Sequence, residues 1–152
     1  MKQSPKWILL KLKVKQWELP TTSAIHQNEI DSLLVDFNNS VSTYIPTSTI
    51  SKFNQANKEY CFNQQDDPFF LESLSRALEI SLETDGAFDP TVMSLVNYWG
   101  FGYGGRDEVK KPNEKVLDSL LSLVGYKKIG IMTKNDTICI FKEKIGMQLD
   151  LS

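Results

Sequence analysis

The chain has 152 residues, of which 41% are hydrophobic and 24% charged, and its formal net charge at pH 7 is -2. This length and composition are typical of one soluble globular domain and exclude an intrinsically disordered chain. The lysines and arginines are scattered along the sequence, so they form no phosphate-binding face and we expect no nucleic-acid partner.

The N-terminal segment predicts a strand. Lysines alternate with apolar residues between Leu9 and Trp17, which is the period of a half-buried strand. The same lysines interrupt the apolar run that a signal peptide requires, and no other stretch is long and apolar enough to span a membrane. The sequence as written therefore predicts a cytoplasmic chain without a membrane segment.

Helices are predicted through the middle of the chain. Apolar residues recur at helical spacing over about residues 25–42. Ser48 is a typical N-cap for a short second helix. Asp66-Asp67-Pro68 starts a third helix, which ends before Gly86. The apolar residues expected on the buried faces of these three helices are Ile30, Leu33, Leu34, Phe37, Val41, Ile50, Phe53, Leu71, Leu74, Leu78 and Leu82.

Two shorter helices follow. Asp89-Pro90 repeats the same start signal for a helix through about Tyr98, and Pro112-Asn113 opens another helix that Gly125 ends. The apolar residues expected to face inward on the last helix are Val116, Leu117, Leu120, Leu121 and Val124.

The tail predicts strands over residues 128–132, 137–141 and 147–151, with Asn135-Asp136 as the turn between the first two. Helices are thus grouped in the middle of the chain and strands at both ends. This order indicates an α+β domain.

Three features have mainly structural interpretations. Residues 100–105 match G-x-G-x-x-G, but a helix rather than a strand precedes them, so a dinucleotide-binding turn is not expected. His26 has no acid or thiol at catalytic spacing and is not expected to be catalytic. Cys61 and Cys139 are too few for a disulfide framework, and we expect them to be small core residues.

Residues 84–92 concentrate special residues in a short segment. Asp89 alone is most simply a helix cap. Alternatively, free backbone N–H groups beside Gly86 can hold a phosphate or the edge of a heterocycle, while Asp89 accepts hydrogen bonds from a ligand or helps to hold a cation. Gly86 permits close approach of a ligand because it lacks a Cβ. Tyr44, after the first helix, is either a half-buried packing residue or a stacking platform.

The segment Thr84-Asp85-Gly86-Ala87-Phe88-Asp89-Pro90-Thr91-Val92 resembles the signature of FAD:protein FMN transferases, the ApbE family. Further segments resemble that family in the same order, so that the resemblance runs from about Ile30 to the last residue. These segments are Ser42-Thr43-Tyr44, Phe53-Asn54, Leu95-Val96-Asn97-Tyr98-Trp99-Gly100-Phe101-Gly102, Val124-Gly125-Tyr126 and Leu149-Asp150-Leu151-Ser152.

The resemblance implies an ApbE-like, T-fold-like flavin transferase domain. Its reaction would be the magnesium-dependent transfer of FMN from FAD to a threonine or serine of a target protein, with release of AMP. FAD would be a substrate, and the target protein a partner. The resemblance places FAD contacts at Tyr44, Ala87, Phe88, Asp89 and Asp150, and it assigns no catalytic residue or metal ligand within this chain.

Several family features are not found in the sequence. The family's N-terminal glycine-threonine segment is not recognisable before Lys11. The loop that contains lysine or glutamate after Asp150 and the later metal ligands are missing. The signal peptide of exported, lipid-anchored members is missing as well. We therefore expect residues 1–152 to be the N-terminal part of the domain, truncated and inactive alone. The alternatives are a non-catalytic flavin-binding remnant, an interaction module, or an FAD hydrolase that yields FMN and AMP.

Overall fold

The computed structural model describes residues 23–102 and 113–151. The chain divides into two compact units, residues 1–33 and residues 34–152. Helix α1 (Ser23–Val41) contributes to both, and it confirms the helix predicted over residues 25–42. The strand predicted between Leu9 and Trp17 lies outside the described residues.

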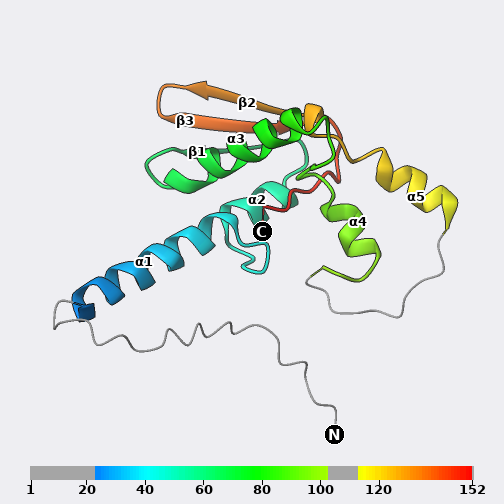
Figure 1. The fold of residues 1–152 in the computed structure, drawn as a ribbon. Helices are drawn as coiled ribbons and strands as arrows, with labels where there is room; N and C mark the ends of the chain where they lie inside the picture. The colour runs from blue at the N-terminus through cyan, green and yellow to red at the C-terminus, as the bar shows by residue number, and fades with distance from the viewer. Residues whose placement is uncertain (1–22, 103–112, 152) are drawn as a thin grey trace, which may run out of the picture. The chain divides into compact units, whose positions relative to one another are not determined.

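The second unit combines short helices with one small sheet, which confirms the α+β class (Figure 1). After α1, its elements are α2 (Thr49–Gln55), β1 (Glu59–Asn63), α3 (Pro68–Glu83), α4 (Met93–Tyr98), α5 (Glu114–Leu121), the 3-10 helix η1 (Tyr126–Lys128), β2 (Ile129–Lys134) and β3 (Thr137–Lys142). The predicted caps of two helices are confirmed: Ser48 accepts a hydrogen bond from the Ser51 amide, and Asp67 accepts from the Phe69 and Phe70 amides.

The sheet has three antiparallel strands in the order β1-β3-β2. β2 and β3 form the predicted hairpin, in which Asn135 takes a φ of 53° at the turn. β1 was not predicted, although Tyr60 and Phe62 alternate with more exposed neighbours. The strand predicted over residues 147–151 is wrong: this segment makes a single parallel bridge, between Val92 and Gln148. The Leu149 backbone binds the Asn54 side chain, and the Asp150 amide binds the Pro90 carbonyl.

The core lies between one face of the sheet and the helices α2 and α3. Its buried residues are Val41, Ile50, Phe53, Phe70, Leu74, Ile138, Ile140 and Leu149. Ile50, Phe53 and Leu74 were predicted to be buried, and each is fully enclosed. Figure 1 shows α3 running alongside the sheet.

Several predicted inward residues are exposed. Leu34 and Phe37 on α1 are 53% and 41% exposed, Leu82 at the end of α3 is 67% exposed, and α5 has no buried residue. In the other unit, Ile30 and Leu33 are also exposed. Apolar spacing identifies the apolar face of a helix, but it does not show whether another element covers that face.

Cys61 and Cys139 form a disulfide, so the prediction that they are small core residues is wrong. The antiparallel register places them directly opposite each other on β1 and β3, with their Cα atoms 4.1 Å apart. Cys61 is exposed, because it lies on the face of the sheet opposite the core. The bond joins strands that are 78 residues apart in the sequence.

We expect this disulfide to stabilise the fold by restricting the unfolded chain. Its reduction, or the double substitution Cys61→Ser with Cys139→Ser, should lower the free energy of unfolding by about 2–4 kcal/mol. Denaturant unfolding with and without a thiol reductant measures this change, and the double variant serves as the control that no longer responds to reductant. An unchanged midpoint on reduction of the unsubstituted chain would contradict the expectation.

Candidate functional site

The segment after α3 forms a tight, fully hydrogen-bonded turn. The Gly86 amide donates to the Ser81 carbonyl at 2.8 Å, and the Asp85 amide donates to the Leu82 carbonyl at 3.2 Å. This is the Schellman pattern that ends many helices. Asp85 takes the left-handed conformation, with a φ of 50°, and Gly86 follows with a φ of 82°. The local sequence therefore determines where α3 ends.

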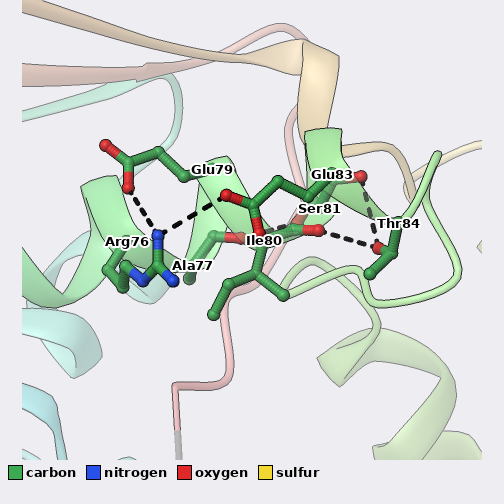
Figure 2. A network of polar contacts seen from close by, with 7 residues as sticks. All are labelled: Arg76, Ala77, Glu79, Ile80, Ser81, Glu83 and Thr84. Carbon is green, nitrogen blue, oxygen red and sulfur yellow. Dashed lines mark hydrogen bonds and ion pairs between the residues drawn. The ribbon is translucent and has the colours of Figure 1, made fainter.

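Thr84 shapes the same turn with its hydroxyl group. Figure 2 shows its Oγ1 pointing back to the last turn of α3, where it donates to the Ile80 carbonyl at 2.8 Å. The same oxygen accepts a hydrogen bond from the Phe88 amide at 3.2 Å. One turn earlier, the exposed Arg76 pairs with Glu79 and Glu83 on the surface of the helix (Figure 2).

Asp89 connects two segments of the chain. Its Oδ1 accepts hydrogen bonds from the Thr91 amide at 2.9 Å and the Thr91 hydroxyl at 2.6 Å, and its Oδ2 accepts from the Tyr126 amide at 2.9 Å. The fully buried Thr91 in turn accepts from the Gly125 amide at 2.7 Å. The carboxylate thereby holds the turn at residues 125–126 against residues 89–91.

Two expectations for this segment are wrong. Asp89 is not a helix cap: α4 begins only at Met93, and the residue before it, Val92, makes no capping side-chain bond. The amides of Gly86, Ala87 and Phe88 are not free either, because each donates to an oxygen of residues 81–84. The turn consumes these donors, which removes the basis for a backbone phosphate site.

Tyr126 belongs to this site and was not predicted as a site residue. A Cβ added to Gly86 would lie 3.5 Å from Cε1 of the Tyr126 ring, so the ring lies close to the glycine. The Tyr126 hydroxyl is buried and has no hydrogen-bond partner among the described residues. The valine-glycine-tyrosine segment at residues 124–126 was the sequence signal that could have identified it. Gly125 takes a φ of 144°, which favours glycine.

The segment that leads to Asp150 is held from one side by α2 and β3. Asn54 binds the backbone of Leu149 with both ends of its carboxamide: Nδ2 donates to the carbonyl at 2.9 Å, and Oδ1 accepts from the amide at 2.7 Å. Lys142 is 3% exposed, and its ammonium donates to the carbonyls of Phe53, Asn54 and Met147 at 3.0–3.2 Å. Both side chains thus join the end of α2 to this segment.

Residues 90–97 bind the other side of the segment that leads to Asp150. Ser94 donates to the Gly146 carbonyl at 3.1 Å, and the Asn97 carboxamide donates to the Gln148 side chain at 3.0 Å. The Asp150 amide donates to the Pro90 carbonyl at 2.8 Å. The structure therefore brings the backbone of Asp150 next to Pro90, which directly follows Ala87, Phe88 and Asp89. Their contacts with FAD stay predictions.

Tyr44 lies in the loop between α1 and α2. Its side chain is 68% exposed. The loop is ordered by the Ser48 hydroxyl, which donates to the Ser42 carbonyl at 2.7 Å, and by the Ser42 hydroxyl, which accepts from the Tyr44 amide at 3.3 Å. Its role in flavin binding stays a prediction.

The glycine loop after α4 is described only as far as Gly102. Gly100 takes a φ of 74°, and a Cβ at Gly102 would overlap the Asn97 carboxamide. The backbone conformation thus favours glycine at position 100, and the close contact with Asn97 requires glycine at position 102. Neither constraint involves binding of a dinucleotide. Phe101 is 70% exposed beside these residues.

The described residues do not fit a complete magnesium site. Within residues 23–102 and 113–151, no group of three or more histidine, cysteine or acidic side chains could hold a metal ion. Asp89 already accepts three hydrogen bonds. Any resident cation would need further ligands.

Comparison with known proteins assigns the family. The family model described as "ApbE family" matches residues 9–152. The chain belongs to the ApbE family.

Curated ApbE relatives carry the name FAD:protein FMN transferase. The Haemophilus influenzae protein is 34% identical over 134 residues, which cover 88% of this chain and 38% of the relative. The Vibrio cholerae protein is 34% identical over 69% of this chain and 30% of its own length.

Solved structures agree with this assignment. Flavin transferase ApbE from Vibrio cholerae superposes with a TM-score of 0.70 at 31% identity, covering 85% of this chain and 40% of the solved chain. The ApbE protein from Thermotoga maritima gives a TM-score of 0.62 at 25% identity, over 82% of this chain and 39% of its own. This ApbE chain thus spans well under half the length of these relatives. No helix in its described part is long and apolar enough to cross a membrane.

The link made by Asp89 in this ApbE chain predicts a specific weakness. Asp89→Asn replaces one acceptor oxygen by an NH2 group, so the Tyr126 amide or the Thr91 pair loses its partner. We expect a loss of about 1–3 kcal/mol in the free energy of unfolding and faster hydrogen exchange at the Tyr126 amide. Asp85→Asn is the matched control, because asparagine tolerates the left-handed conformation. Equal stability of the two variants would contradict this role.

Lys142 predicts a pH dependence. Burial lowers the pKa of its ammonium from 10.5 to about 8. The unfolded chain therefore holds more protons between about pH 8 and pH 10.5, and Lys142 makes the free energy of unfolding rise as the pH rises through this window. Carbon NMR of the lysine Cε groups should show one lysine titrating near pH 8. Lys142→Met should remove that signal and Lys134→Met should leave it; titration of every lysine near 10.5 would refute the shift.

Proposed function

We propose that this chain forms one wall of the FAD site of an FAD:protein FMN transferase. The observation that carries the proposal is the hydrogen bond that joins Asp150 to Pro90. It brings together the two separate segments to which the family resemblance assigns flavin contacts. Membership of the ApbE family and the names of the relatives support it. In the complete enzyme, FMN would pass from FAD to a threonine or serine of a target protein, and AMP would leave.

The hydrogen bonding of residues 86–89 indicates which part of FAD this wall would contact. The amides of residues 86–88 are used within the turn, whereas no hydrogen bond among the described residues uses the carbonyls of residues 86–89. Carbonyl oxygens accept hydrogen bonds from the N–H groups of a heterocycle and repel phosphate oxygens. We infer that this wall binds a ring edge of FAD and leaves the pyrophosphate to other residues.

Exposed apolar surface beside these carbonyls supports the same assignment. Phe88 is 42% exposed, Ala87 is also exposed, and the Tyr126 ring lies against Gly86. A planar ring system gains contact area on such surfaces. Asp89 and Thr91 would keep the segment rigid, so that its carbonyls are oriented before FAD binds.

Magnesium dependence and phosphoryl transfer are proposed for the complete enzyme. Magnesium would neutralise charge on the pyrophosphate. In this chain the backbone of Asp150 is held beside Pro90 by a hydrogen bond. Since the described residues hold no metal cluster, we infer that residues 1–152 bind FAD weakly and do not transfer FMN by themselves.

Nitrogen–proton NMR of the 152-residue chain during titration with FAD tests the flavin wall. We expect saturable shifts at the amides of residues 86–89 and 150, weak affinity, and smaller shifts with inorganic pyrophosphate. Ala87→Glu places a charged side chain on the wall and should weaken binding at least tenfold, whereas the equivalent change on exposed α5, Ser119→Glu, should not. Absence of FAD-dependent shifts at residues 86–89 would refute the proposal.

A separate assay tests transfer. The chain is incubated with FAD, magnesium and a threonine-containing acceptor protein, and covalent flavin and AMP are measured, with the Vibrio cholerae enzyme as positive control. We expect neither product from residues 1–152. Covalent flavin would contradict the inference of inactivity, and AMP with free FMN would indicate hydrolysis of FAD instead.

A further inference from the structure

The segment that leads to Asp150 has a buried side and a less buried side. Met147 and Leu149 are fully buried, whereas Gln148 and Asp150 are only partly buried. Side chains alternate in this way along an extended chain. Leu149 belongs to the core, and Leu151 packs against it. The apolar side chains of this segment therefore recur at every second residue.

This alternation alone does not determine the register of the segment, that is, which of its residues lies beside α2. A shift by one residue would place polar side chains in the core, so burial excludes it. A shift by two residues would keep apolar side chains in the core. It would move Asp150 by about 6–7 Å, because an extended chain rises by about 3.3 Å per residue. Another interaction must therefore select the observed register.

Asn54, near the C-terminal end of α2, makes an interaction that can select it. Asn54 is 9% exposed, and its carboxamide binds the amide and the carbonyl of Leu149 at 2.7 and 2.9 Å. A carboxamide carries a donor and an acceptor side by side. It can therefore take the place of a neighbouring strand, which this segment lacks among the described residues.

Lys142 supports the same register. Its ammonium donates to the Met147 carbonyl and to the carbonyls of Phe53 and Asn54 at 3.0–3.2 Å. Met147 lies two residues before Leu149 and is also buried, so both polar contacts are made on the buried side of the segment. Lys142 is only five residues from Met147, whereas Asn54 is 95 residues from Leu149. Asn54 thus supplies the long-range contact nearest to Asp150.

We propose that Asn54 is a positioning residue for flavin binding. Through the Leu149 backbone it selects the register that brings Asp150 beside Pro90, and it does not contact FAD itself. This inference rests on the proposed function, because the position of Asp150 matters only if FAD binds there. Loss of Asn54 should release this segment but not the turn at residues 86–88, whose amides bond within the turn.

Asn54→Leu removes both hydrogen bonds at similar side-chain volume. In nitrogen–proton NMR of the 152-residue chain titrated with FAD, it should weaken binding at least tenfold. FAD-dependent shifts should persist at residues 86–88 and disappear at residue 150, a pattern that general destabilisation does not produce. The double substitution Cys61→Ser with Cys139→Ser is the stability control. It removes no bond of the segment and should leave the FAD affinity unchanged.

Asn54→Asp is a milder variant. Its carboxylate still accepts a hydrogen bond from the Leu149 amide but cannot donate to the carbonyl. We expect an FAD affinity between those of the unsubstituted chain and Asn54→Leu. Asn39→Asp, which adds the same charge at an exposed position of α1, is the matched control and should have no effect. If Asn54→Leu does not fold, Asn54→Asp decides the outcome.

The outcomes separate the two proposals. Unchanged FAD affinity and retained shifts at residue 150 in the Asn54 variants would overturn the positioning role and leave the flavin wall intact. An equal loss of affinity in the disulfide variant would also overturn it, because the effect would then follow stability alone. Absence of FAD-dependent shifts in the unsubstituted chain would refute the flavin wall, and the positioning role with it.

Discussion

The second unit depends on the backbone of residues 146–150 being bound from two sides. Asn54 pairs with both backbone groups of Leu149, and the buried ammonium of Lys142 connects the end of α2 to Met147. On the other side, the segment bonds to Pro90 and Ser94. No strand of the sheet pairs with this segment, and its single bridge is to Val92. Side chains, together with the carbonyl of Pro90, therefore supply bonds that a strand would obtain from its neighbours.

This arrangement determines where the site residues lie. Asn54 fixes the position of Leu149, and the next residue, Asp150, then meets Pro90 beside the turn that ends α3. Asp89 extends the same connection to Tyr126. Hydrogen bonds thus join three segments that are distant in sequence, and the turn at residues 86–88 uses its own amides.

Helix α3 separates two surfaces with different chemistry. Its C-terminal end leads to the exposed ring of Phe88, whereas its N-terminal end carries Asp67, which lines a recess together with Asp36 and Asp66. The same residue types serve different purposes at the two ends. Both oxygens of Asp89 are occupied by protein donors, while one oxygen of Asp67 has none among the described residues. Charge alone would not distinguish these two aspartates in the sequence.

The sequence by itself determined the local structure that depends on near neighbours. The caps Ser48 and Asp67, the turn at Asn135-Asp136 and the end of α3 before Gly86 follow from side chains that bond within a few residues. The order of motifs also indicated the family. These predictions hold because capping and turn formation require no distant partner.

Only the tertiary structure decided the contacts between distant residues. Cys61 meets Cys139 because of the register of two strands 78 residues apart. Lys142 continues the inward alternation of Ile138 and Ile140, yet a buried lysine is tolerated only because three carbonyls surround it. The apolar residues of α1 are the converse case, because the sequence predicts that they are buried and the structure leaves them exposed. A sequence specifies which face of a helix or strand is apolar or charged, and the folded chain decides what meets that face.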